Sequence, residues 1–298
     1  MSLIAFWLIL VSAVLHATWN LISKCHRPSV VFYAQSTGTA ALFWVPLLLY
    51  VKPDFAALPP GFWYFLAGSV CFEVIYYAGL AHAYSRSDIS VAYPMARSLP
   101  VLLTALITVT FGLGTPPGPS VWLGLTLIFF GCLILPLPDW SDFRWKSYCT
   151  PALVFIILAA CGTTGYTILD SFGIKLAISA LPDAGRLQGC VYMALVEPLN
   201  CLGLLAVTVF SADSRREFKR SFARSVWPSL SGVASSLAYV LILAAMPYVN
   251  NVSFVQAFRQ MSLPMCMIFG VMVLHERCSS TKIVGCAAII IGLILASI

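Results

Sequence analysis

The sequence predicts an all-α integral membrane protein with ten transmembrane helices arranged as two inverted five-helix repeats. The first observation is composition: of 298 residues, 60% are apolar and 9% are charged, whereas about a quarter of the residues of a soluble domain are charged. The second is a series of apolar segments about 20 residues long, the length that a helix needs to cross a bilayer. The third is a similarity between the two halves of the chain. A soluble globule, a disordered chain and a nucleic-acid-binding protein are excluded, since charges are few and no basic run would follow a phosphate backbone.

The ten apolar segments are separated by short breaks that hold proline, glycine and charged residues, as expected of loops. The segments are 3–23, 30–51, 62–84, 88–111, 120–138, 151–172, 186–210, 226–246, 250–274 and 281–298. Residues 1–138 form the first repeat, 139–150 a connecting loop and 151–298 the second repeat. The alternation typical of an outer-membrane barrel is absent, so each segment is predicted to be a helix. The first segment is expected to be retained, because it lacks the basic start and clean cleavage site of a signal peptide.

Basic residues are unevenly distributed between the loops. The loops after odd-numbered segments hold twelve lysines and arginines, five of them between residues 213 and 224, and the loops after even-numbered segments hold three. Because cytoplasmic loops carry the excess of basic residues, the odd-numbered loops are predicted to be cytoplasmic and both termini to lie outside. The expected location is the cell (inner) membrane, as a multi-pass protein.

The two halves match in order when the first is shifted by 163 residues. The matched positions are Tyr76 with Tyr239, Ala81 with Ala244, Asp88 with Asn251, Ser90 with Ser253, and Arg97 with Gln260, which Arg259 precedes. Further on, each half has two glycines seven residues apart, Gly124 with Gly131 and Gly285 with Gly292, a spacing that suits close helix packing in lipid. Each half has an odd number of segments, so the second half must be inverted. Inverted repeats are typical of transporters, whose substrate site lies near the midplane.

Two short stretches resemble a known family. The first is His16-Ala17-Thr18-Trp19-Asn20, which ends at Lys24 in the first segment. The second is Glu276-Arg277, just before the last segment, followed by Gly285 and Ile291-Gly292. Together with the ten segments in two sets of five, these stretches resemble the drug/metabolite transporter superfamily, EamA-like branch.

The resemblance implies a secondary transporter, more often an exporter, with a central cavity lined by segments 1, 3, 4, 6, 8 and 9. Where the first half would have a counterpart of Glu276-Arg277, residues 112–116 read Gly-Leu-Gly-Thr-Pro, which favours a structural role for that pair at a helix end. Family members often have cytoplasmic termini, whereas the loop charges predict the opposite, so the orientation stays open. The first stretch also resembles membrane proteins found with phosphonate-utilisation genes, which indicates aminophosphonates as one possible substrate class.

Four charged residues lie well inside predicted segments, namely Glu73, Arg97, Glu197 and Arg259. Charged side chains at bilayer depth are energetically costly, so such residues are expected to have a function. Glu73 and Arg97 either line a cavity or form a structural ion pair between neighbouring helices, and Arg259 has no acid within its own segment. The resemblance places the segment of Glu197 away from the cavity. Asp170 lies near the end of the sixth segment, where a carboxylate can reach water.

Polar residues recur at helical spacing on segments 3, 4, 8 and 9, and such stripes are expected to face inward rather than lipid. The alternative explanation is hydrogen bonding between helices, and Trp19, close to a segment end, equally fits an interface anchor. The candidate substrate-binding residues are Trp19, Asn20, Glu73, Tyr76, Tyr77, Tyr93, Arg97, Tyr166, Tyr239, Gln256, Arg259 and Gln260.

The predicted function is secondary active transport, as export, of a small polar metabolite such as an amino acid or another zwitterion. The arginines would bind a carboxylate or phosphonate, and Glu73 or the tyrosines would bind an amine. Glu73 is also the candidate proton carrier, since its carboxyl can exchange a proton as the cavity opens. The alternatives are export of lipophilic cationic drugs and transport of an aminophosphonate.

The sequence gives little support to other functional classes. An enzyme is not indicated, because the four histidines are scattered and no catalytic motif is present. The ten cysteines show no metal-ligand spacing and suit packing in apolar helices, so no metal or cofactor is expected. A channel, a scaffold or a receptor is a further alternative, although the short loops leave little surface for partners. The expected partners are a small-molecule substrate, the lipid bilayer and protons as coupling ion, and a monomer is plausible.

Overall fold

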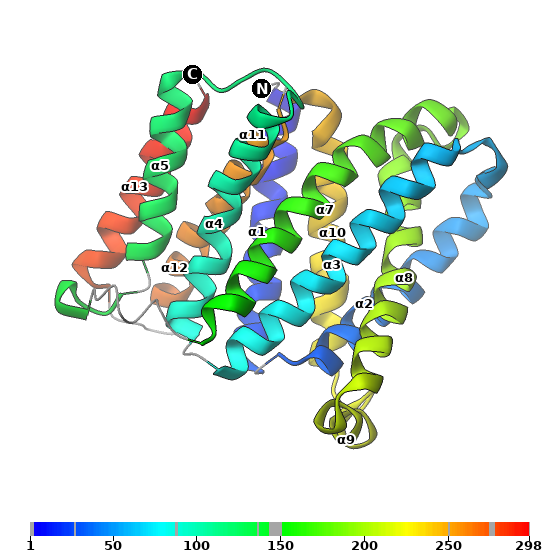
Figure 1. Ribbon diagram of the computed structural model, residues 1–298, viewed down its shortest axis with the longest axis horizontal. Helices are drawn as coiled ribbons and strands as arrows, with labels where there is room; N and C mark the ends of the chain where they lie inside the picture. The colour runs from blue at the N-terminus through cyan, green and yellow to red at the C-terminus, as the bar shows by residue number, and fades with distance from the viewer. Residues whose placement is uncertain are drawn as a thin grey trace.

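The structure is a computed structural model that describes residues 3–26, 28–86, 89–135, 137–142, 151–249, 251–273 and 278–297. Over these ranges the chain is helical and contains no strand (Figure 1). Six helices are long and apolar enough to cross a membrane, and three further apolar helices are shorter. The chain is therefore an α-helical protein of the multi-pass membrane type.

The helices fall on the predicted apolar segments. In chain order they are α1 (Leu3–Cys25), α2 (Val30–Val51), α3 (Pro60–Arg86), α4 (Ile89–Thr110), α5 (Pro119–Ile134), α7 (Leu153–Ala180), α8 (Gln188–Phe210), α9 (Ala212–Ser221), α10 (Trp227–Ala245), α11 (Val252–Phe258), α12 (Ser262–Val273) and α13 (Ser280–Ser297). Short 3₁₀ turns are η1 (Phe55–Ala57), η2 (Trp140–Asp142), η3 (Pro182–Leu187), η4 (Met246–Tyr248) and η5 (Arg259–Met261).

Two helix ends differ from the predicted ones by more than two residues, and one predicted break contains a helix. Helix α5 ends at Ile134, and α7 continues to Ala180, well past the predicted end at 172. The predicted break at 213–224 contains the short helix α9, which is fully outside the core. Its N-cap is Ser211, whose hydroxyl accepts a hydrogen bond from the Ser214 amide, and its last turn carries basic side chains that suit a helix C-terminus.

The ninth predicted segment is a broken helix. Helix α11 is followed by the 3₁₀ turn η5 and then by α12, whereas α4, at the matching place in the first half, runs unbroken from Ile89 to Thr110. The side chain of Asn251 caps α11 by accepting from the Ser253 amide at 2.9 Å. The break lies at Arg259, one of the candidate site residues.

The helices of the two halves pack against each other. Helix α3 packs along α7, α1 along α10, α2 along α8, and α5 along α13. The α5–α13 contact confirms the close packing expected at the four glycines: a Cβ on Gly124 would lie 2.5 Å from the Gly292 carbonyl oxygen, and one on Gly131 would lie 2.9 Å from that of Gly285. Only glycine allows these backbones to approach so closely.

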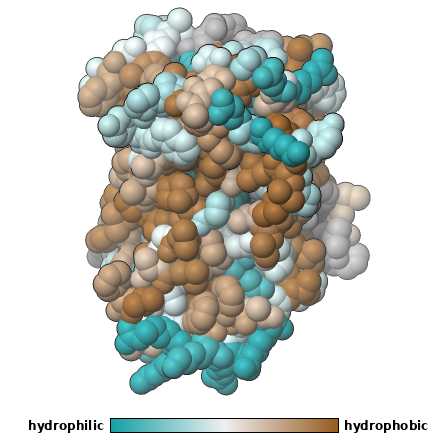
Figure 2. Space-filling model, turned by 90° about the vertical axis from the view of Figure 1, so that its right-hand side faces the viewer, coloured by the Kyte–Doolittle hydropathy of each residue, from teal (hydrophilic) through white to brown (hydrophobic). Residues whose placement is uncertain are grey.

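The two ends of the molecule are polar and its middle is apolar. Figure 1 shows both termini at one end and α9 at the opposite end. On the face seen in Figure 2, an apolar band separates two polar ends, and large apolar side chains such as Leu42, Leu49 and Ile75 are exposed. This distribution suits a protein that is surrounded by lipid at its middle.

Several predicted features lie outside the described residues. These are Arg27, Asp88, Arg144, Lys146, Glu276 and Arg277, together with most of the connecting loop at 139–150.

Candidate functional site

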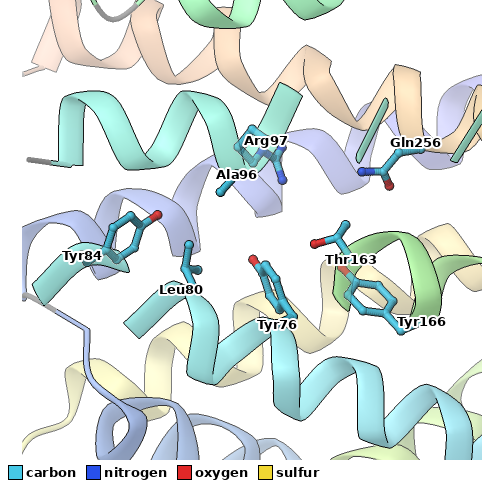
Figure 3. Close-up of a pocket in the computed structure, with 8 residues that line it drawn as sticks. All are labelled: Tyr76, Leu80, Tyr84, Ala96, Arg97, Thr163, Tyr166 and Gln256. Carbon is cyan, nitrogen blue, oxygen red and sulfur yellow. The ribbon is translucent and has the colours of Figure 1, made fainter. Parts of the chain in front are cut away.

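Two small adjoining pockets lie among helices of both halves. The larger has a volume of about 30 Å³, which is room for about two water molecules. Its lining residues are His16, Trp19, Glu73, Tyr76, Tyr77, Tyr166, Met193, Glu197, Ser235, Tyr239 and Arg259. The smaller, of about 10 Å³, is lined by Tyr76, Leu80, Tyr84, Ala96, Arg97, Thr163, Tyr166 and Gln256 (Figure 3). Because Tyr76 and Tyr166 line both pockets, the two form one central region.

Nine of the twelve candidate site residues line this central region. Of the other three, Asn20 donates from its side-chain amide to the His16 carbonyl of its own helix at 2.7 Å. Gln260 donates to the Gln256 carbonyl at 3.3 Å, and its own Oε1 is buried without a hydrogen-bond partner among the described residues. The side chain of Tyr93 lies outside the described residues.

Arg97 is held firmly by groups from both halves. Its Nη1 lies 2.6 Å from His16 Nε2, and its Nη2 donates to Ser262 Oγ at 2.7 Å and to the Arg259 carbonyl at 3.3 Å. The other ring nitrogen of His16 lies 2.9 Å from Trp19 Nε1. A neutral imidazole accepts through one ring nitrogen only, so His16 accepts from Arg97 or from Trp19. Arg97 therefore joins α1 and α4 to the break in the ninth segment.

Arg259 is held far more loosely. Its Nη1 lies 3.4 Å from Gln256 Oε1 and its Nη2 lies 3.3 Å from the Tyr166 hydroxyl, both at the long limit of a hydrogen bond. The guanidinium carbon lies 5.3 Å from the centre of the Tyr239 ring, within cation–π distance. The Nε of Arg259, like that of Arg97, is buried with no hydrogen-bond partner among the described residues, and in Arg259 both Nη contacts are long as well. An unpaired buried donor is costly, so a ligand acceptor beside Arg259 would be favourable.

The ion pair considered for Glu73 and Arg97 does not form. The Glu73 carboxylate instead accepts from the side-chain amide of Asn200 on α8. Over the described parts of the chain, the one ion pair within 4.0 Å joins Arg216 to Asp213 at 3.7 Å, and both of these side chains are exposed. Glu73 thus faces the cavity without an ion pair to a basic side chain among the described residues.

Asp170 is buried, and the expectation that it reaches water is wrong. Because α7 continues beyond the predicted end, Asp170 lies inside the helix with no exposed surface. Its two carboxylate oxygens accept from the hydroxyls of Tyr192 at 2.7 Å and of Tyr239 at 2.5 Å. Tyr239 lines the cavity, so one hydrogen bond joins the cavity wall to the Asp170 carboxylate.

Glu197 also faces the cavity, although the resemblance placed its segment outside it. Its side chain is 4% exposed and lines the larger pocket. On α10, the Ser236 hydroxyl accepts from Trp44 Nε1 at 2.8 Å. The central region thus holds three buried carboxyl groups, at Glu73, Asp170 and Glu197, beside two guanidinium groups.

Sequence reasoning missed His16, Met193 and Thr163 as lining residues, whereas Ser235 belongs to the polar stripe of the eighth segment that was expected to face inward. The sequence could have indicated His16, because it precedes Trp19 and Asn20 by three and four residues and so shares their helix face. Met193 and Thr163 resemble ordinary packing residues of apolar helices. Only the tertiary packing identifies them as lining residues.

No family model and no curated protein matches the chain. Its fold nevertheless resembles that of solved structures. One of them, described only as "Crystal structure of protein", superposes with a TM-score of 0.68 over 98% of this chain and 96% of that chain, at 14% sequence identity. At this level of identity the similarity concerns the fold alone.

Proposed function

We propose that the protein is a secondary transporter with ten membrane crossings in two inverted five-helix repeats, 1–138 and 151–298, of the drug/metabolite transporter type. The helix packing supports this proposal. If each element of the first repeat has its counterpart five crossings later, the α3–α7 contact corresponds to the α10–α1 contact, and α2–α8 and α5–α13 each correspond to themselves. The glycine contacts between α5 and α13 are symmetric too, because a Cβ on Gly124 would meet the Gly292 carbonyl and a Cβ on Gly292 would meet the Gly124 carbonyl. Such symmetry suits alternating access.

The proposed substrate is a small zwitterion such as an amino acid. The main support is that the cavity is lined by groups of both charges. Arg259, with an unpaired Nε, shares one pocket with Glu73 and Glu197, and tyrosines form much of the wall. A guanidinium whose Nε is free can bind a carboxylate or a phosphonate through Nε and Nη together. The carboxylates and aromatic rings would receive the amine. An aminophosphonate would satisfy the same groups.

Glu73 is the proposed proton carrier. It lines the cavity, and its hydrogen-bond partner Asn200 is a neutral amide rather than a cation. A carboxyl group placed in this way can bind a proton in one conformation and release it in another, so a proton gradient would drive transport. Export, with the α9 end in the cytoplasm and both termini outside the inner membrane, is the proposed direction and orientation.

The test is a thermal-shift screen of purified protein in detergent with amino acids, aminophosphonates, quaternary amines and lipophilic cationic drugs. A ligand that binds the folded state raises the unfolding temperature by mass action. We expect zwitterions to raise the unfolding temperature of the wild type and of Arg186→Ala, whose arginine is exposed in η3. The same ligands should not raise that of Arg259→Ala. Zwitterions that stabilise Arg259→Ala as strongly as the wild type would contradict the proposal.

A second candidate is export of lipophilic cations. The observation that favours it is the excess of three buried carboxyl groups over two guanidinium groups, next to tyrosine rings that can stack on a cation. In that case cationic drugs would stabilise the wild type and Arg259→Ala alike, and Glu73→Gln would remove their effect. Proton-driven uptake into proteoliposomes, compared between the wild type and Glu73→Gln, then tests the coupling role of Glu73 for either substrate.

A further inference from the structure

A groove lies outside the central region, between α2 and the start of α10, at the end of the molecule where α9 lies. Its volume is about 460 Å³. One wall is a single face of α2, and the other is the α9–α10 connection with the first turn of α10. The lining residues are Gln35, Gly38, Thr39, Leu42, Phe222, Ala223, Arg224, Ser225, Val226 and Ser229. The groove is therefore apolar toward Leu42, and toward the connection its polar groups, Arg224 among them, lie beside Phe222 and Val226.

The loop that forms the polar end is fixed by a buried glutamine. Gln35 Nε2 donates to the Ser225 carbonyl at 2.7 Å, and Gln35 Oε1 accepts from the Ala223 amide at 3.0 Å. Ala223 has a φ of +57°, a left-handed conformation that is unusual for alanine. The two hydrogen bonds from one side chain stabilise this turn, so Arg224 between them is presented in a defined position.

The polar end is strongly basic. Helix α9 and Arg224 together carry five arginines and lysines and two acidic residues. Glu217 is bound by the Ser29 hydroxyl at 2.5 Å, and Asp213 is paired with Arg216. The Arg224 side chain is exposed, and no hydrogen bond or ion pair of its guanidinium joins it to another described residue. A phosphate beside Arg224 would meet a positive field with no competing acid in the groove lining.

The apolar end of the groove opens onto the surface that faces lipid. Leu42 is 72% exposed, and Leu49, two turns further along the same face of α2, is 68% exposed. At the polar end, the exposed Trp227 ring stacks on His26 with 4.8 Å between ring centres. Tryptophan is enriched at the level of lipid headgroups, so this end of the groove lies at headgroup depth.

We propose that the groove binds an anionic phospholipid, with the phosphate at Arg224 and an acyl chain along the Leu42–Leu49 face of α2. The chemistry matches along the whole groove, because a basic end at headgroup level leads directly to an apolar surface that faces lipid. A soluble phosphate compound would use only the basic end. Basic groups near a membrane attract anionic lipids, and the fixed turn at Arg224 makes the attraction local. This inference does not depend on the proposed substrate.

The experiment is native mass spectrometry of the detergent-purified protein with phosphatidylglycerol or phosphatidylcholine added. We expect the wild type to retain phosphatidylglycerol and not phosphatidylcholine. Arg224→Ala should bind it about fivefold more weakly, the effect of one basic group near an anionic surface. Arg186→Ala, the same charge change at the other end of the molecule, should bind as the wild type does.

Two further arms distinguish the sources of the phosphate and the role of the apolar wall. Glycerol 3-phosphate in excess should not displace the bound lipid, and Leu42→Gln should weaken retention while leaving the fold intact, since Leu42 is exposed. Equal retention by Arg224→Ala and the wild type would overturn the proposal. So would equal retention of the two lipids by the wild type, and displacement by glycerol 3-phosphate would replace the lipid site with a site for a soluble anion.

Discussion

The two buried arginines of the fourth and ninth segments, Arg97 and Arg259, make different contacts. Arg97 makes contacts of 2.6 and 2.7 Å to His16 and Ser262, whereas neither side-chain hydrogen bond of Arg259 is shorter than 3.3 Å. Arg259 lines the larger cavity, and Arg97 reaches only the smaller one. Two buried arginines in neighbouring pockets thus differ in their contacts: Arg97 bonds at short distance to groups of both halves, and Arg259 is the one that we propose for a ligand.

The backbone explains the difference. At the 3₁₀ turn η5 the Arg259 carbonyl accepts from the Ser262 backbone N–H, and it also accepts from Arg97 Nη2 and Ser262 Oγ. Helix α4 is unbroken. The guanidinium of the first half therefore adds a hydrogen bond to the backbone of the second half. With its carbonyl held in place, Arg259 can direct its own side chain toward the cavity.

The largest effect is expected from Arg97→Ala. This change removes the contacts of one buried side chain to His16, to Ser262 and to the Arg259 carbonyl together, which should destabilise the folded state by about 3 kcal/mol. The measurement is the unfolding temperature in detergent without ligand, where Arg97→Ala should unfold well below the wild type and below Arg259→Ala. If Arg97→Ala is as stable as the wild type and only fails to respond to ligand, Arg97 is a binding residue and the comparison fails.

Arg259→Ala should show the opposite pattern. Its hydrogen bonds are long and its Nε is unpaired, so its loss should change stability by no more than about 1 kcal/mol. Ligand affinity should instead fall by more than tenfold, since a charge-assisted bidentate contact is worth about 1.5–3 kcal/mol. Titrating the thermal shift against ligand concentration gives the affinity. Arg259→Lys, which keeps the charge and loses the planar fork, should recover only part of it.

The sequence was a good guide to the helices and a partial guide to the site. Apolar runs located the long helices because lipid requires about 20 apolar residues per crossing, and the spacing of glycines predicted close helix packing, which occurs between α5 and α13. A bend in the ninth segment was indicated by Pro264, which lies three residues beyond η5 and lacks the N–H that would bond to the Gln260 carbonyl. Its position at Arg259 was not predicted, and the tertiary hydrogen bond from Arg97 to the Arg259 carbonyl is visible only in the structure.

The same limit applies to Asp170. A carboxylate near the expected end of a helix was taken to reach water, and only the longer α7 and two distant tyrosines show that it is buried and satisfied. Periodicity places residues on a face but gives neither the length of a helix beyond its apolar core nor the partners across the interface.

A smaller effect separates two tyrosines that share one carboxylate. Tyr192→Phe and Tyr239→Phe each remove one hydrogen bond to Asp170, and each should cost about 1 kcal/mol of stability. Only Tyr239 lines the cavity and lies against the Arg259 guanidinium. Tyr239→Phe should therefore weaken ligand binding, and Tyr192→Phe, the matched control, should not. Equal loss of affinity in both variants would show that Asp170, rather than the position of Arg259, governs the site.

The smallest effect is expected from Ser262→Ala, which tests whether Arg97 acts as a tie between the halves. The Ser262 hydroxyl both accepts from Arg97 and donates to the Arg259 carbonyl. Its loss leaves Arg97 Nη2 with its bond to that carbonyl and leaves the His16 contact in place, so stability should fall by about 0.5 kcal/mol. The Arg97→Ala and Ser262→Ala losses of stability should be less than additive in the double variant, because residues in one hydrogen-bond network couple.

The control is Ser262→Ala combined with Arg259→Lys, whose losses of stability should be additive, since the Arg259 side chain makes no contact with the Ser262 hydroxyl among the described residues. Additive losses for Arg97→Ala with Ser262→Ala would mean that the guanidinium and the hydroxyl act separately, and that the broken helix is stabilised by its own packing.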